Sequence, residues 1–532
     1  MVRGWILVPV LREGYDGCWL QRQDVHDSGR SPQLAMAPRR TSIAFLCALS
    51  LGCGKRAVDP GPPIAVVGES TRLRIEDPHP KTTPWFDGTT VTLVAARGET
   101  IGIQVRHRDA GTVSLVVPGI AVAGFDVESY RVSRPSTALY GGSHGVGRYA
   151  DGLVAAKPTT NPAYFELAIP RDAEPGTRTG TLKIGDAQFP VTLAIAKVTL
   201  PPLPRSVWAY EDPRELVGFA PQAGSRPAVG DAERSCIAMF AEHGVLLAPD
   251  VQLDLWPERK ALFAGWRDVP VVIPTEPAAA AEAVRGWIEA TRGTGHVPFT
   301  IPIDEPRTSE SRREVRALAD AVRAAGGGPD TFRYAVTAEP HPEFGSSIDL
   351  YISWRAAHLA GDPHARWTYN GAPPFAGSLV LDAETPGTRT WGWIAWRWKI
   401  PVWYVWDALY WHDRHNTRGK PKPGRALDPA VDPVSFDDGE DRGNLDGVLA
   451  LPGCMRTLRL AALRRGLQDR QLLELAEKCN PTAARSLAAQ VVPYALADAV
   501  GRARSWSTDE GTWELARREL LKLASCALET PN

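Results

Sequence analysis

Hydrophobic and polar residues alternate in short runs along the early part of the chain, at residues 71–75, 90–94, 101–105, 164–167 and 191–195. A period of two places alternate side chains on opposite faces of a strand, so one face of each run enters a core. Turn-forming clusters such as Glu174-Pro175-Gly176 separate the runs. The pattern predicts an antiparallel β-sandwich over residues 54–204, ending at the proline-rich linker 201–204. No acid pair or histidine cluster stands out in it, so we expect it to serve packing or binding.

After residue 204, strand-like runs alternate with amphipathic helical patterns. Two apolar helix faces are clear, formed by Ala283, Val284, Trp287 and Ile288 and by Val315, Leu318, Ala319 and Val322. Eight alternating units predict a (β/α)8 barrel over residues 205–480, closed by a helix at 456–478, with a helical tail at 481–532. The chain is therefore expected to combine an all-β and an α/β domain. The eight strand-like runs lie at 206–210, 244–247, 270–274, 298–303, 332–337, 349–353, 378–382 and 401–406.

The first 53 residues have the pattern of an upstream extension followed by an export signal. Residues 1–35 show no apolar period, and Met36 is a plausible start. Arg39 and Arg40 precede a short apolar stretch at 43–51, which is too short for a permanent membrane span. The ending Leu-Ser-Leu-Gly-Cys resembles a bacterial lipobox, which predicts lipid attachment at Cys53 and a cell-envelope location. A plain signal peptide, with a periplasmic or secreted protein, is the alternative.

The composition of the chain limits the classes of binding partner that we expect. The formal net charge of −1 supplies no electrostatic reason to bind nucleic acid or an anionic membrane surface, so we expect membrane contact only through the lipid. Nine of the 18 tryptophans lie between Trp354 and Trp411. A flat apolar ring with an N–H edge suits a pocket for a ring-shaped polar ligand. Packing in a large core is the alternative use of these rings.

Four cysteines lie in the predicted folded region, at Cys236, Cys454, Cys479 and Cys526, and they allow three disulfide pairings. If one helix covers 456–478, Cys454 and Cys479 are more than about 30 Å apart at 1.5 Å per residue, which is too far for a bond. None of the four has the spacing of a zinc site.

The run 298–303 ends in two adjacent carboxylates, Asp304 and Glu305. In a parallel α/β barrel, the carboxyl ends of the strands face the ligand cleft. We therefore identify Asp304 and Glu305 as the candidate catalytic residues. The alternative is structural: one caps the next helix and the other forms a surface ion pair.

Three further segments, together with this acid pair, resemble the catalytic domain of glycoside hydrolase family 123 over about residues 65–480. They are the tryptophan-rich segment 391–411, which we place around the seventh and eighth strands, the segment 446–453 (Asp-Gly-Val-Leu-Ala-Leu-Pro-Gly), and the segment 458–469 ending in Arg-Gly-Leu-Gln-Asp. The last is the most specific. Members of this family are β-N-acetylgalactosaminidases that use the substrate's own acetamido group as nucleophile, without a cofactor.

The resemblance implies that Glu305 is the general acid/base and that Asp304 orients the acetamido group. The substrate would be a glycan or glycoconjugate ending in N-acetylhexosamine. Tyr369 and Asn370, which follow Trp367, are candidates to contact the acetamido oxygen, since a phenol there can form a hydrogen bond. Trp367 is a further substrate-binding candidate, and the candidate platforms for stacking on a sugar are Trp391, Trp393, Trp406 and Trp411.

Two other functions stay open. A glycosidase with two catalytic carboxylates needs a second acid, for which Glu339, Asp382 and Glu384 are available near strand ends. A surface lipoprotein that binds carbohydrate without turnover would have the same fold. His412 and His415 suggest a metal, but the sequence shows no convincing third ligand, so we expect none.

Overall fold

The computed structural model describes residues 60–108, 111–137, 142–218, 230–354, 366–413, 416–417, 420–421, 425–502 and 505–528. The described chain from Gly61 onward lies in one compact unit. The expected export signal, Cys53 and His415 lie outside the described residues. Within them, no helix has both the length and the apolar character that crossing a membrane requires.

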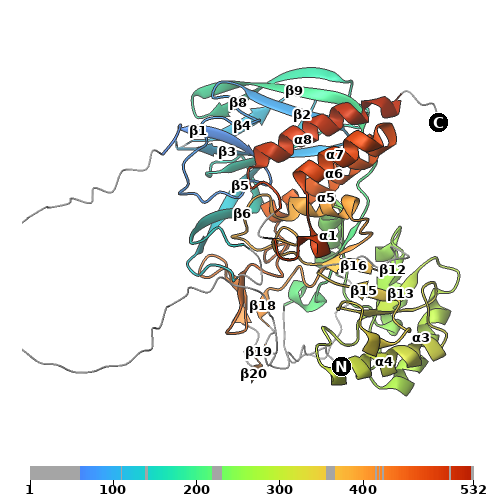
Figure 1. Cartoon of the computed structure of the whole chain (residues 1–532). Coiled ribbons are helices and arrows are strands. Elements are labelled where there is room, and N and C mark those ends of the chain that lie inside the picture. The colour runs from blue at the N-terminus through green and yellow to red at the C-terminus, as the bar shows by residue number, and fades with distance from the viewer. Residues whose placement is uncertain are drawn as a thin grey trace, which may run out of the picture. The chain divides into compact units, whose positions relative to one another are not determined.

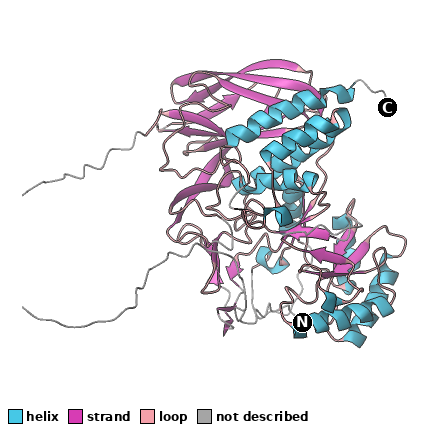
Figure 2. Ribbon diagram, viewed as in Figure 1, coloured by secondary structure: helices cyan, strands magenta, loops and turns pink. Residues whose placement is uncertain are grey.

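Two β-sheets form the N-terminal part, shown as magenta arrows in Figure 2. The first is antiparallel throughout, in the order β1 (Ile64–Gly68), β3 (Thr100–His107), β7 (Ala163–Ala168), β5 (Ala121–Val132) and β6 (Gly147–Ala155). The second has the order β2 (Val91–Arg97), β9 (Ala187–Thr199), β8 (Gly176–Ile184) and β4 (Val113–Val116). Its β2–β9 pair is parallel and the others are antiparallel. Apolar residues from both sheets share one core.

The sandwich expectation is confirmed, with one strand misplaced. The run 71–75 forms a single bridge from Arg74 to Tyr149 and not a strand. Its polar positions are arginines that form ion pairs. Arg74 pairs with the nearby Asp77 at 2.7 Å, and Arg72 pairs with the sequence-distant Asp151 at 3.4 Å. The actual first strand is β1, buried at all five positions.

Eight parallel strands follow: β10 (Val207–Ala209), β11 (Val245–Leu247), β12 (Asp268–Pro270), β13 (Val297–Thr300), β14 (Arg333–Val336), β15 (Leu350–Ile352), β16 (Arg366–Tyr369) and β17 (Trp403–Val405). Their order is β11-β10-β17-β16-β15-β14-β13-β12, and every neighbouring pair is parallel. A parallel bridge from Val251 to Val271 joins the segments that follow the two outer strands, β11 and β12. The sheet therefore curls into the predicted barrel; Figure 1 shows β12, β13, β15 and β16 with α3 and α4 beside them.

Aromatic rings fill the interior of the barrel. The Trp208 ring lies 5.1 Å from Phe299, 6.4 Å from Trp367 and 4.3 Å from Tyr404, and Phe299 lies 5.0 Å from Trp367. These rings come from β10, β13, β16 and β17. Large flat side chains from strands on opposite sides meet at the centre, so the barrel is a packed core and its ligand site must lie at an end.

The seventh strand is β16 and not the predicted run 378–382. That run is apolar because it is buried in a loop whose backbone bonds leave the barrel: Leu381 donates to Asn444 at 2.8 Å, and the Asp382 carbonyl accepts from His144 at 2.7 Å. Tertiary burial, and not strand pairing, explains its composition. Only the second part of the tryptophan-rich segment 391–411 contains a barrel strand, β17. Its first part is the helix α5 (Thr390–Arg397), buried at every position up to Trp396.

The other helices are α1 (Asp231–Ala241), α2 (Trp256–Arg259), α3 (Pro277–Thr291), α4 (Ser309–Ala324), α6 (Leu458–Cys479), α7 (Pro481–Val491) and α8 (Glu510–Leu523). The predicted face of α4 is fully buried, whereas on α3 Val284 and Trp287 are buried and Ala283 and Ile288 half-buried. The expected last barrel helix is α6, and α7 and α8 form the helical tail beside it (Figure 1). Short strands follow the barrel at β18 (His412–Asp413), β19 (Asn416–Thr417), β20 (Lys420–Pro421), β21 (Arg425–Ala426), β22 (Val434–Asp437) and β23 (Arg442–Asn444).

Two disulfides join Cys236 to Cys454 and Cys479 to Cys526, each with a Cα–Cα distance of 5.7 Å. This is one of the two pairings that the length of the helix left open.

Candidate functional site

Asp304 and Glu305 lie in the loop that follows β13. The strand ends at Thr300, four residues before Asp304, so the two carboxylates lie in the loop and not on the strand. Glu305 has a left-handed backbone, with φ of 42°. In an extended strand two adjacent side chains point to opposite faces. The turn at Glu305 breaks that alternation.

Thr337, just after β14, binds both acidic residues. Its hydroxyl donates a hydrogen bond to Asp304 Oδ1 at 2.7 Å. The Thr337 hydroxyl oxygen also accepts a hydrogen bond from the backbone N–H of Glu305 at 2.8 Å. One side chain on the neighbouring strand end therefore fixes the position of the pair. The predicted fifth strand ended at this residue, which was the sequence signal for it, although its role was missed.

Both oxygens of Glu305 have partners. The Tyr369 hydroxyl, at the end of β16, donates to Oε1 at 2.8 Å, and Arg307 Nη2 lies 2.5 Å from Oε2. Burial raises the pKa of Tyr369 well above its usual value, and the charges of Glu305 and Asp304 raise it further. The phenol therefore stays protonated and donates. The sequence singled out Tyr369 as a contact of the substrate's acetamido oxygen, not as a partner of Glu305, and it did not single out Arg307.

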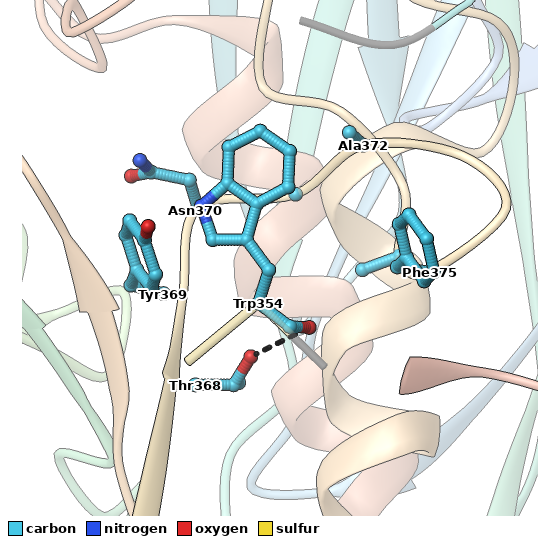
Figure 3. A pocket seen from close by; sticks show the side chains of 8 residues that line it. Trp354, Thr368, Tyr369, Asn370, Ala372 and Phe375 are labelled. Atoms are coloured by element: carbon cyan, nitrogen blue, oxygen red, sulfur yellow. Dashed lines mark hydrogen bonds between the residues drawn. The ribbon is translucent and has the colours of Figure 1, made fainter. Parts of the chain in front are cut away.

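A small pocket adjoins Tyr369 (Figure 3). The Trp354 ring, which follows β15, lies 5.8 Å from the Tyr369 ring. Its buried Nε1–H has no hydrogen-bond partner among the described residues. A buried donor without a partner is expensive unless a ligand or water satisfies it. Trp354 is therefore a ligand-binding candidate that the sequence did not single out. The pocket is lined by Trp354, Thr368, Tyr369, Asn370, Gly371, Ala372, Phe375 and Ala376.

Asn370 connects this pocket to β17. Its backbone is left-handed, with φ of 49°, and its side-chain oxygen accepts the backbone N–H of Trp406 at 3.1 Å. Trp406 is half-buried, and its indole donates to Asp446. Burial raises the pKa of Asp446 to about 7, against the opposing effect of this bond. Of the five candidate tryptophans, Trp406 is the one that is partly exposed.

The other four tryptophans are packing residues, which corrects their assignment as sugar-binding residues. Trp367 is 1% exposed and fills the barrel interior. Trp391 stacks on Trp403 at 4.7 Å, and Trp393 donates to Asp469 at 2.9 Å; both are fully buried. Trp411 is 5% exposed and donates to the Ala450 carbonyl at 2.8 Å. None of these rings leaves a face for a sugar.

The three alternative acids differ in their surroundings. Asp382 is fully buried and accepts bonds from the Ser136 backbone and hydroxyl, at 2.8 and 2.6 Å, and from Ser143. Its oxygens are committed to holding the loop against the sandwich, so it is not a nucleophile. Glu339, after β14, is half-buried and accepts from Ser353. Glu384 is half-buried in the loop before α5.

His412 Nδ1 lies 2.6 Å from Glu215 Oε2, an ion-pair geometry. In the part of the chain that the structure describes, no group of three or more His, Cys, Asp or Glu residues could hold a metal ion.

The described chain thus combines two mainly antiparallel β-sheets with a parallel eight-stranded barrel that has polar residues beyond its strand ends. The fold is similar to that of a family 123 glycoside hydrolase from Clostridium perfringens, with a TM-score of 0.53 and 10% identity over 88% of this chain and 98% of that one. The resemblance to family 123 is thus confirmed as a likeness of fold. A glycosyl hydrolase family 2 member from Bacteroides cellulosilyticus matches more weakly, with a TM-score of 0.25 and 11% identity over 64% of this chain and 48% of that one. The sequence matches no protein-family model and no curated protein.

Proposed function

We propose that the protein is an exo-acting β-N-acetylhexosaminidase, with N-acetylgalactosamine as the preferred sugar, that retains configuration by substrate-assisted catalysis. The observation that carries this proposal is the placement of Glu305 between Tyr369 and Arg307, beside an Asp304 held by Thr337. The likeness of fold to a family 123 enzyme, whose structure was described for glycolipid glycan hydrolysis, supports it.

In this mechanism the acetamido oxygen attacks the anomeric carbon while the glycosidic bond breaks. Glu305 gives its proton to the leaving oxygen, and Asp304 accepts the amide N–H and stabilises the positive charge of the oxazolinium ion. Water then attacks the anomeric carbon and breaks its bond to the acetamido oxygen, which restores the acetamide, and the proton of the water goes to Glu305. Trp354 and Trp406 supply apolar surface for the sugar, and the Trp354 N–H is a donor for one of its oxygens.

The test is dependence on the 2-acetamido group. Chromogenic β-GalNAc and β-GlcNAc should be hydrolysed, whereas β-galactoside and β-glucoside should not. A thiazoline analogue of N-acetylgalactosamine should bind much more tightly than the sugar, because it resembles the charged intermediate. Asp304→Asn should strongly lower turnover. A covalent adduct of a 2-deoxy-2-fluoro sugar on Glu339 or Glu384 would instead establish a two-carboxylate mechanism.

We also propose that Cys53 carries a lipid that anchors the protein at the cell envelope, which rests on the signal-like pattern before it. Membrane fractionation of Cys53→Ala should find the protein released or unprocessed. Wild-type protein recovered in the soluble fraction with a different N-terminus would refute the anchor.

A further inference from the structure

The two oxygens of Glu305 face two different partners. Oε1 accepts from Tyr369, which is anchored on β16 and lines the Trp354 pocket. Oε2 pairs with Arg307, two residues further along the same loop. The Arg307 side chain is 59% exposed, against 28% for Glu305. One partner is thus fixed in the scaffold, and the other is a long side chain that is more than half exposed.

A general acid must present its proton to the glycosidic oxygen. Because Oε1 is held by the fixed Tyr369 on the pocket side, Oε2 is the oxygen that the leaving group reaches. The guanidinium of Arg307 occupies that position, so it must withdraw when substrate binds. It then lies beside the leaving group and has lost one charge-assisted hydrogen bond.

We propose that Arg307 selects substrates whose leaving group carries a carboxylate or sulfate, such as an acidic sugar next to the N-acetylhexosamine. This deepens the proposed function and rests on it. The substrate's anion replaces Glu305 as the partner of the guanidinium, whose planar fork fits both groups. The anion also needs this cation, because Asp304 and Glu305 otherwise repel it.

Two aryl N-acetyl-β-galactosaminides of nearly equal size test the selection, one with a 3-carboxyphenyl and one with a 3-carboxamidophenyl leaving group. In the wild type, kcat/KM should favour the carboxylate by up to about fivefold, the upper end for one exposed charge pair. This preference should shrink at high salt. Arg307→Gln should abolish or reverse the preference. The matched control is Arg313→Gln, which removes an exposed arginine from α4 and should keep the wild-type ratio.

Calorimetry with the corresponding thioglycosides, which are not turned over, measures the same charge preference as a ratio of dissociation constants. Hydrolysis with no charge preference, or with a preference that survives Arg307→Gln, overturns the role of Arg307. The proposed hydrolase function is then unaffected. Charge-selective binding that Arg307→Gln abolishes, in a protein that hydrolyses neither glycoside, supports Arg307 and overturns the hydrolase.

Discussion

Glu305 and Asn370 both have left-handed backbones, with φ of 42° and 49°. This conformation costs a residue with a side chain about 1–2 kcal/mol. It persists where surrounding contacts fix it: Thr337 accepts the Glu305 N–H, and the Tyr404 carbonyl accepts the Asn370 N–H at 2.8 Å. Both residues follow barrel strands and carry polar groups of the candidate site, so the strain coincides with the site.

Glu305→Gln keeps the size of the side chain and removes its acidic proton. With N-acetylhexosaminides that have poor leaving groups, kcat/KM should fall about 10²–10⁴-fold. The loss should be smallest with good leaving groups, which need little protonation. Steady-state rates over a series of aryl glycosides measure this, with Glu310→Gln, an acid in the first turn of α4, as control. An equal loss across the series contradicts the acid role.

Glu211 makes stability depend on pH. It is fully buried after β10 and within hydrogen-bonding reach of Glu233, which pairs with Arg259 at 2.5 Å. Burial raises the pKa of Glu211 well above its ordinary 4.5, and Glu233 and Asp407 raise it further. The folded protein therefore keeps a proton that the unfolded chain loses. Its stabilising contribution is complete below about pH 4.5 and is lost as the pH rises.

Glu211→Gln is neutral at every pH, so it removes this loss. The free energy of unfolding of the variant should rise relative to wild type between about pH 5 and about pH 8. Urea denaturation at both values measures the difference. Glu258→Gln, at an exposed position on α2, should show no such trend; a pH-independent difference for Glu211→Gln would mean that Glu211 is ionised in the folded protein.

At the scale of elements, α6 explains the most specific part of the family resemblance. The Arg-Gly-Leu-Gln-Asp segment is buried throughout. An added Cβ at Gly466 would lie 2.4 Å from the Arg389 carbonyl, so glycine allows α5 to approach. The segment thus joins the barrel to the sandwich and marks architecture, not chemistry. Its other contacts are Arg465 with Glu69 and Glu99, Gln468 with the Thr100 backbone, and Asp469 with Arg389 and Trp393.

Arg465→Met removes one partner from two buried carboxylates, Glu69 at 2.9 Å and Glu99 at 2.7 Å. Breaking buried ion pairs in this way costs about 3–5 kcal/mol. We expect the lower end, because Glu69 keeps Arg464 and Glu99 keeps Arg517. Urea denaturation measures it. Arg470→Met, on the same helix but in a more exposed pair with Glu474, should cost less than about 1 kcal/mol. Equal effects would show that the network adds little.

At the scale of the whole molecule, buried ion pairs connect the sandwich to the barrel and the tail. Arg459 of α6 binds Asp151 of β6 at 2.9 Å, and Arg517 of α8 binds Glu99. The Cys236–Cys454 disulfide closes a separation of 218 residues. Separating these parts would break several buried ion pairs at once, which is unfavourable. The unfolding of one part is therefore coupled to the unfolding of the others.

We therefore expect the sandwich and the barrel to unfold together in urea. Trp85 is the one tryptophan within 54–204, so tryptophan fluorescence reports mainly on the barrel and tail. Hydrogen exchange of β3, β7 and β9 reports on the sandwich. The two transitions should share a midpoint. Exchange in the sandwich strands at a lower urea concentration than the fluorescence change would show that the parts unfold separately.

The sequence by itself determined the order of the elements and the position of the acid pair. Seven of the eight predicted runs overlap barrel strands, and the α4 face is buried as its spacing predicted. Asp304 and Glu305 follow β13 as expected. These features succeed because alternation, helical spacing and strand ends are local properties that a short segment carries.

Tertiary structure alone decided which apolar segments pair as strands and which side chains face the site. The run 378–382 and the tryptophans of α5 are apolar because their surroundings are core, not because of a strand or a sugar. The hydrophobic effect is non-directional, so an apolar run indicates that a segment is buried. It does not indicate which element buries the segment. The contacts of Glu305 with Tyr369 and Arg307 likewise depend on how the strand ends meet in space, which no local pattern encodes.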